Sequence, residues 1–263
     1  MPHISATRYA VVSCHVERPL DDRVWAAFSR LQAARPGGFA IAALMRPPDH
    51  EAREDAATFV ERAREAAARG PLGHHTHWTS PTHARPSGGD PGARVLEEGR
   101  WLREHGLEPT LFCGGGWYLD ASVAAAAAAL GYADCTSTSF RPPYLPPGAP
   151  RGSLAAPAWL ELGGARLLGI PTTHSVGMLL RAALDPRALR EPVAHAYFHD
   201  TDLLDRRRAA ALRAGLALLG RRRRVTDLDR LAAELRAGGE VPVEDLAVAL
   251  GEGAPVEPAA VGE

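Results

Sequence analysis

The chain has 263 residues, of which 46% are hydrophobic and 23% are charged, and its formal net charge is −1. This composition suits one large α/β domain or two small ones, and the charge balance excludes the basic surface that nucleic acid binding needs. All thirty basic residues are arginine, which excludes a Schiff-base lysine and a Walker-type phosphate loop.

Short apolar runs alternate with helical segments along the chain. The runs predicted to be strands are Tyr9–Val16, Phe39–Met45, Leu72–Trp78, Glu108–Phe112, Tyr132–Thr136, Arg166–Ile170 and Val193–Phe198. The segments predicted to be helices are Asp22–Ala34, Glu51–Arg69, Pro91–His105, the alanine-rich stretch after Asp120, about Leu204–Leu219 and about Asp227–Arg236. This alternation predicts an α/β fold with a mostly parallel sheet, open or closed into a barrel.

The remaining segments are predicted to lie outside the core. Residues 140–157 are rich in Pro and Gly and are expected to form a long surface loop. We expect residues 1–240 to form the single domain and residues 241–263 to be an acidic, Gly/Pro-rich tail without a core of its own.

Three cysteines lie far apart and form no CxxC pair, so neither a disulfide framework nor a structural zinc cluster is predicted. No charged start followed by a long apolar run opens the chain, and no apolar stretch reaches the roughly 18 residues of a membrane helix. We therefore expect a cytoplasmic protein with free thiols and no membrane span.

Polar side chains gather where four of the predicted strands end. In parallel α/β folds these ends meet on one side of the sheet, where binding and catalysis occur. The four segments are Cys14–Glu17, Gly73–Trp78, Asp134–Ser137 and His195–Asp202. This repeated placement predicts a functional site at that edge.

His75 and His77 are the sharpest signal in these segments. Because residues i and i+2 of a strand point to the same face, both imidazoles would reach one metal ion. A third ligand is required, and a carboxylate suits a hydrolytic site that keeps one position open. The structural alternative is that both histidines line a polar loop.

His199 and Asp200 form the second candidate pair. At a strand end, His199 would protonate a leaving group while Asp200 holds its tautomer. Alternatively, His199 packs under the loop and Asp200 caps the following helix. Asp22 likewise has two interpretations, a site carboxylate or an acidic residue at a helix start.

The order of these segments resembles the polysaccharide deacetylase superfamily, the carbohydrate esterases that share the nodulation-deacetylase homology domain, over about residues 8–236. VVSCHVE (Val11–Glu17) is similar to a divergent Asp-Val-Glu form of the first family motif, with His15 in place of the aspartate. GHHTHWTSP (Gly73–Pro81) is similar to the second motif and places His75 and His77 in the ligand positions.

Three later segments extend the resemblance. LFCGGGWYLD (Leu111–Asp120) keeps the place and the aromatic Trp117 of the third motif but lacks its arginine. LGYADCTST (Leu130–Thr138) is similar to the segment that follows in divergent branches. AYFHDTDLL (Ala196–Leu204) resembles the last motif and places His199 in the position of the general acid.

The resemblance implies an irregular (β/α) barrel of about seven parallel strands that removes an N-acetyl or similar acyl group from a small amino sugar or glycoconjugate. A divalent metal ion, expected to be Zn²⁺, would be held by His75, His77 and a carboxylate, Glu17 first and Asp22 second. His199 would be the general acid, and His15 or a carboxylate such as Asp22 the base. The predicted substrate contacts are Trp78, Trp117, Tyr118 and Asp200, although the three aromatic side chains are also candidates for the core.

Two other functions compete with this one. Loss of the first aspartate and of the third-motif arginine suits a degenerate deacetylase-fold protein that binds a glycan or a partner enzyme. An amidohydrolase also uses an HxH pair, but on its first strand and often with a bridging lysine. Here two strand–helix units precede the pair and lysine is absent, so this third hypothesis ranks last.

Overall fold

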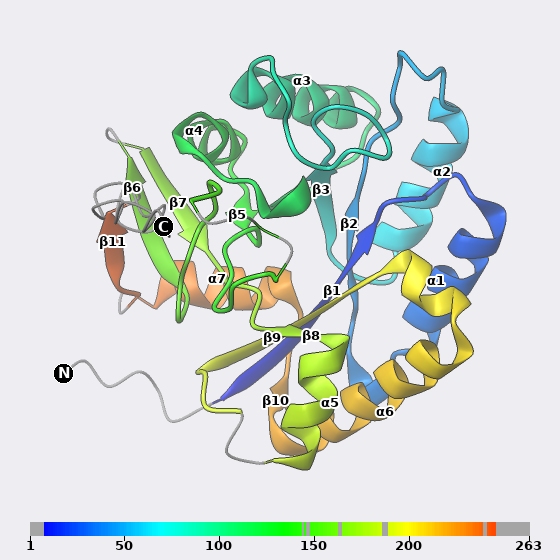
Figure 1. Cartoon of the computed structure of the whole chain (residues 1–263), viewed down its shortest axis with the longest axis vertical. Coiled ribbons are helices and arrows are strands. Elements are labelled where there is room, and N and C mark those ends of the chain that lie inside the picture. Colours follow the sequence, from blue (N-terminus) through cyan, green and yellow to red (C-terminus); the bar gives the residue numbers. More distant parts are fainter. Residues whose placement is uncertain are drawn as a thin grey trace, which may run out of the picture.

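The computed structural model describes residues 8–143, 145, 148–162, 165–185, 189–238 and 241–245. The described strands join one sheet in the order β11-β6-β7-β5-β4-β3-β2-β1-β9-β8, with β10 paired to β1 outside that row (Figure 1). Every strand pairing in it is parallel except β6 with β7. The predicted α/β class with a mostly parallel sheet is therefore confirmed.

The described strands are between two and eight residues long. They are β1 Tyr9–Val16, β2 Ala42–Met45, β3 Leu72–Thr76, β4 Leu111–Gly114, β5 Ala133–Asp134, β6 Ala158–Leu162, β7 Ala165–Gly169, β8 His174–Ser175, β9 Val193–His199, β10 Arg224–Val225 and β11 Val243–Asp245.

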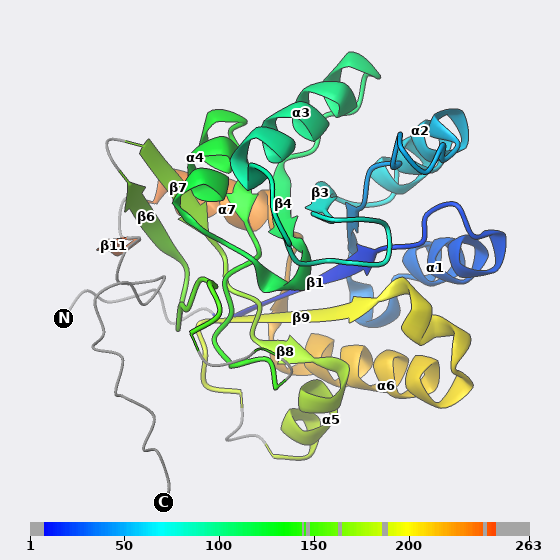
Figure 2. The same cartoon turned by 45° about the horizontal axis from the view of Figure 1, so that its top comes forward.

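Aspartate N-caps start most of the helices, since the carboxylate accepts from first-turn amides that have no helical partner. The helices are α1 Asp22–Ala34, α2 Ala56–Ala67, α3 Pro91–Glu104, α4 Ala121–Ala129, α5 Val176–Leu184, α6 Arg206–Arg222 and α7 Leu228–Ala237. Their caps are Asp21, Asp55, Asp90, Asp120, Ser175, Asp205 and Asp227. Figure 2 shows α1, α2 and α6 beside the central strands, and α3 and α4 beside β3 to β7.

Strand β1 lies between β2 and β9. Its alternate side chains point to opposite faces of the sheet. Val12 and Cys14 join the outer core that α1, α2 and α6 cover, whereas Val11 joins an inner core. Helix α7 contributes Leu228 and Leu231 to that inner core. His15 shares the parity of Val11, so the inner face of β1 changes from apolar to polar toward its carboxyl end.

The segment between β7 and β8 carries hydrogen bonds to strands on both sides of it. Ile170 N donates to Asp134 O at the end of β5, and Thr173 N donates to His195 O on β9. The end of the row at β8 and β9 is thereby linked back to β5.

Several elements differ from the predictions for local reasons. Helix α2 begins at Ala56 because Asp55 caps it, five residues later than predicted. Strand β4 begins at Leu111, beyond Pro109, which has no amide hydrogen for a ladder. Strands β6, β8 and β11 and helix α5 were not predicted.

The predicted division at residue 240 needs correction. Strand β11, inside the segment expected to be a coreless tail, pairs in parallel with β6 through Val243–Asp245. Residues 246–263 of that segment lie outside the described residues. Across the described part of the chain, no helix has the length and apolar character required to cross a bilayer.

Candidate functional site

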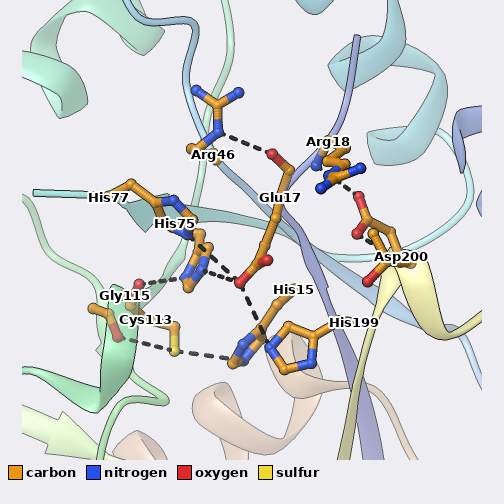
Figure 3. Close-up of polar contacts among 12 residues, drawn as sticks. His15, Glu17, Arg18, Arg46, His75, His77, Cys113, Gly115, His199 and Asp200 are labelled. Atoms are coloured by element: carbon orange, nitrogen blue, oxygen red, sulfur yellow. Dashed lines mark hydrogen bonds and ion pairs between the residues drawn. The ribbon is translucent and has the colours of Figure 1, made fainter. Parts of the chain in front are cut away.

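The carboxyl ends of β1, β3 and β9 bring one carboxylate and three imidazoles together (Figure 3). Oε1 of Glu17, just after β1, lies 3.8 Å from Nε2 of His75 and 3.5 Å from Nε2 of His77. On another side, Nε2 of His199 lies 3.5 Å from the same oxygen. The three strand ends therefore converge as the sequence predicted.

Backbone carbonyls fix the tautomers of His75, which lies in β3, and of His77, which follows it. Nδ1 of His75 donates to Cys113 O at 2.8 Å, and Nδ1 of His77 donates to Pro81 O at 2.9 Å. Because a carbonyl only accepts, each Nδ1 carries the hydrogen and each Nε2 keeps its lone pair. Both Nε2 atoms are buried without a hydrogen-bond partner. This is how metal-ligating histidines are oriented in proteins.

The spacing of the ligand atoms also fits a metal ion. With metal–ligand bonds of about 2.1 Å, a tetrahedral ion holds its ligand atoms about 3.4 Å apart. The distances from Glu17 to His77 and His75, 3.5 and 3.8 Å, are close to this value. Glu17, His75 and His77 form a group whose ligand atoms all lie within 4.8 Å of one another. The donor set of two imidazoles and one carboxylate fits Zn²⁺ and leaves a fourth position.

The protonation states suit the same role. Burial alone would raise the pKa of Glu17, but contacts with His75 and His77 and the charge of His199 lower it well below its ordinary value. Burial lowers the pKa of His75, so its imidazole is neutral at pH 7. A carboxylate and a neutral imidazole are the forms that bind metal.

His199 differs from His15, His75 and His77, which are buried, because its side chain is 35% exposed. Its backbone N donates to Oδ2 of Asp202 at 3.0 Å, and the same oxygen lies 3.9 Å from its Nδ1. The carboxylate beside this imidazole is therefore Asp202, not the predicted Asp200. The sequence HDTD contains both aspartates, and only the geometry of the 3₁₀ turn over Asp200–Leu204 distinguishes them.

His15 lies under the cluster and is buried. Its Nε2 is 3.5 Å from Sγ of Cys113, and its ring centroid is 4.7 Å from that of His75. His15, His75 and Cys113 form a second group with metal-ligand spacing. His75 has only one free nitrogen, however, so its lone pair serves one group at a time.

Arg46 supports Glu17 and was not singled out from the sequence. Its Nε donates to Glu17 O at 2.9 Å, and its two terminal nitrogens each lie 2.8 Å from a carboxylate oxygen of Glu54. A buried arginine directly after an apolar strand was the available signal, since such a charge requires partners.

Two predicted carboxylates lie elsewhere. Asp22 is 89% exposed at the start of α1 and forms an ion pair with Arg62, away from the cluster. Asp200 is buried and accepts from the backbone N of Arg18 and of Thr201. Burial is the largest cause that raises its pKa, to about 6. The structure thus gives Asp200 a role in holding the chain that follows Glu17, rather than a free surface for substrate.

Of the three aromatic residues predicted as substrate contacts, Trp78 and Trp117 are buried and Tyr118 is half-buried. Trp78 is buried, donates from Nε1 to Gly115 O and packs edge-on against Tyr118. Tyr118 donates its hydroxyl to Asp120. Trp117 is buried with its ring centroid 5.2 Å from that of His15. Of these three rings, that of Trp117 packs against the His15 imidazole, beside the cluster.

Comparisons with known proteins find a similar fold but do not identify a family. No family model matches the chain, and no curated protein matches it. Among solved structures, the chain resembles a 4-alpha-glucanotransferase from Thermococcus litoralis, with a TM-score of 0.55 and 12% identity over 87% of this chain and 40% of that chain. The chain thus spans less than half of that protein's length, and at this identity the likeness shows the fold alone.

Proposed function

We propose that this chain is a metal-dependent hydrolase that removes an N-acetyl or similar acyl group from an amino sugar or glycoconjugate. The observation that carries the proposal is the arrangement of Glu17, His75 and His77, with two buried Nε2 lone pairs directed toward one carboxylate oxygen. The resemblance of five sequence segments to polysaccharide deacetylases supplies the reaction type.

The connectivity of the sheet supports an irregular barrel of the kind that this family uses. The hydrogen bonds of Ile170 and Thr173 link the segment between β7 and β8 to β5 and to β9, and we propose that through this segment seven parallel strands, β8, β9 and β1 to β5, form a ring. The candidate site then lies over the carboxyl-end opening of that ring, where barrel enzymes hold their chemistry.

The buried and the partly exposed residues of the cluster would have different roles. His75, His77 and Glu17 would hold the ion, which would supply Lewis acidity to an acyl carbonyl. His199, the partly exposed imidazole, would give a proton to the departing amine. Asp202 lies within ion-pair distance of its Nδ1 and would hold the ring in place.

His15 stands where the resemblance expects a base, and its environment argues for a supporting role. Burial, followed by the charges of His75 and His199, lowers its pKa well below the ordinary value. A general base works best with a pKa near the operating pH. We therefore assign proton transfer to His199 and assign to His15 the packing of the His75 ring.

Turnover of N-acetylated sugars tests the proposal. The protein loaded with Zn²⁺ should release acetate from N-acetylglucosamine or its oligomers. His75→Ala should abolish release, whereas His105→Ala, which changes an exposed histidine on α3's carboxyl-terminal side, should not. Activity that is equal in His75→Ala and the unaltered protein would overturn the assignment.

The competing proposal, a degenerate protein that binds a glycan without cleaving it, rests on one observation. The buried, neutral His15 replaces the expected aspartate, so the cluster has one carboxylate where the family has two. Sugar-dependent thermal stabilisation with no acetate release from any N-acetylated substrate would favour this function.

A further inference from the structure

A cavity of about 530 Å³ adjoins His199 on the side of helices α5 and α6. The first turns of these two helices and the end of β9 line it, and His199 and Tyr197 form part of its wall. Its volume lies in the range of small-molecule sites. It is therefore large enough for one or two sugar rings beside the imidazole.

The cavity has an excess of positive charge. Asp202, Arg207 and Arg208 supply its charged side chains. Asp202 is already engaged, because its Oδ1 accepts from Arg208 at 2.8 Å and its Oδ2 accepts from the backbone of His199. Among the described residues, no carboxylate lies within ion-pair distance of Arg207. The exposed guanidinium of Arg207 thus lies at the cavity wall and is available to an anionic ligand.

The arginines at the start of α6 occupy a position that is electrostatically unfavourable for positive charge. Arg206, Arg207 and Arg208 occupy the first turn of α6, where positive charge opposes the helix dipole. The first turn of α5, with Val176 and Gly177, faces the same cavity and adds the positive end of a second dipole. Local rules of this kind are broken mainly where function requires it.

We propose that the substrate carries an anionic group, a carboxylate or a phosphate, and that this cavity binds it through Arg207. The inference rests on the proposed function for its orientation. His199 lies between Glu17, 3.5 Å from its Nε2, and the cavity that its ring lines. A leaving amine protonated by His199 would consequently belong to the part of the substrate that occupies the cavity, which is the sugar.

Binding of reaction products tests the inference without turnover. Isothermal titration would compare glucosamine, glucosamine 6-phosphate and glucosaminuronic acid, a neutral, a phosphate-bearing and a carboxylate-bearing probe. We expect at least one anionic probe to bind about tenfold more tightly than glucosamine, as a charge-assisted pair allows. The anionic probe that binds more tightly identifies the anion as a phosphate or a carboxylate. Inorganic phosphate is titrated as well, as an anion that carries no sugar.

Two pairs of variants separate the cavity from general charge. Arg207→Gln should reduce the preference for the anionic probe about tenfold, whereas Arg206→Gln, in the same helical turn but outside the cavity lining, should leave it within twofold. A Cβ at Gly177 would meet no atom within 4 Å. Gly177→Glu should therefore repel the anionic probes, and the isosteric Gly177→Gln should not.

Equal affinity for all three probes, or equal effects of Arg206→Gln and Arg207→Gln, would overturn the inference. The outcome is separable from that of the proposed function. Acetate release from neutral and anionic N-acetyl sugars at the same kcat/KM would leave the hydrolase and remove the anion subsite. Anion preference without any acetate release would keep the subsite and contradict the hydrolase.

Discussion

Nε of Arg46 donates to the backbone carbonyl of Glu17 at 2.9 Å, and the arginine is held in turn by both carboxylate oxygens of Glu54. The carbonyl of the candidate ligand is thus fixed from β2, while the amide of the following residue, Arg18, donates to Asp200 from the β9 side. The backbone around Glu17 is therefore held from both sides, by residues that follow β2 and β9.

Arg46→Lys should weaken metal binding while the protein stays folded. Lysine keeps the charge but lacks the planar fork that binds Glu54 at two points and Glu17 at a third. Supporting residues of metal ligands typically contribute 10- to 100-fold in affinity, so we expect roughly a tenfold rise in the Kd for Zn²⁺ by competition with a chelator. The matched control is Arg230→Lys, whose side chain is 80% exposed on α7. Equal Kd values for Arg46→Lys and the control would contradict this role.

Burial gives His195 a pKa of about 4. Since its unfolded-state pKa is about 6.5, protons bind the unfolded chain more tightly. The stabilisation is complete above pH 6.5 and decreases as the pH falls toward 4, by about 3 kcal/mol in total. Chemical denaturation in the presence of a chelator should show a smaller loss in the free energy of unfolding between pH 7 and pH 4.5 in His195→Gln than in the unaltered protein. Parallel curves would show that this histidine does not titrate as described.

Asp200 should contribute with the opposite sign. Burial raises its pKa to about 6, so protons bind the folded chain more tightly. Its ionisation destabilises the fold at neutral pH, and its contribution to the free energy of unfolding increases as the pH falls from 6 toward 4. In Asp200→Asn this contribution disappears, and the free energy should decline more steeply over that interval than in the unaltered protein. An unchanged or shallower decline would contradict the assignment.

Gly73 sets how closely β3 packs against its neighbours. A Cβ at this position would lie 2.2 Å from Cδ2 of Leu44 and 3.0 Å from Cβ of Leu111. Gly73→Ala should therefore lower the free energy of unfolding by about 1–3 kcal/mol through overpacking. Gly177→Ala is the matched control, because its Cβ meets no atom within 4 Å. A stability for Gly73→Ala equal to that of the control would mean that β3 shifts without penalty.

Period-two alternation explains why part of the site was predictable. The predicted strand over Leu72–Trp78 placed His75 and His77 on one face. Although β3 ends at Thr76, both imidazoles lie near Glu17, which follows β1 and shares the parity of His15. What the sequence could not supply was the pairing between strands. Arg46 reaches Glu17 because β2 lies next to β1, and the linear order of residues does not encode that register.

The wrong predictions have equally local causes. Asp21 and Asp22 are adjacent, and the helix uses the first as its cap, which places the second outward beside Arg62. Strand β6 and its partner β11 were missed because residues near 160 and 243 pair only through tertiary contacts.

The metal content of the purified chain tests the central claim most directly. After incubation with Zn²⁺ and removal of the unbound metal, elemental analysis should find about one ion per chain in the unaltered protein and in His105→Ala, and less than a tenth of that in His77→Ala. An unaltered protein without stoichiometric metal, or a His77→Ala variant that retains it, would contradict the assignment of Glu17, His75 and His77 as a metal site.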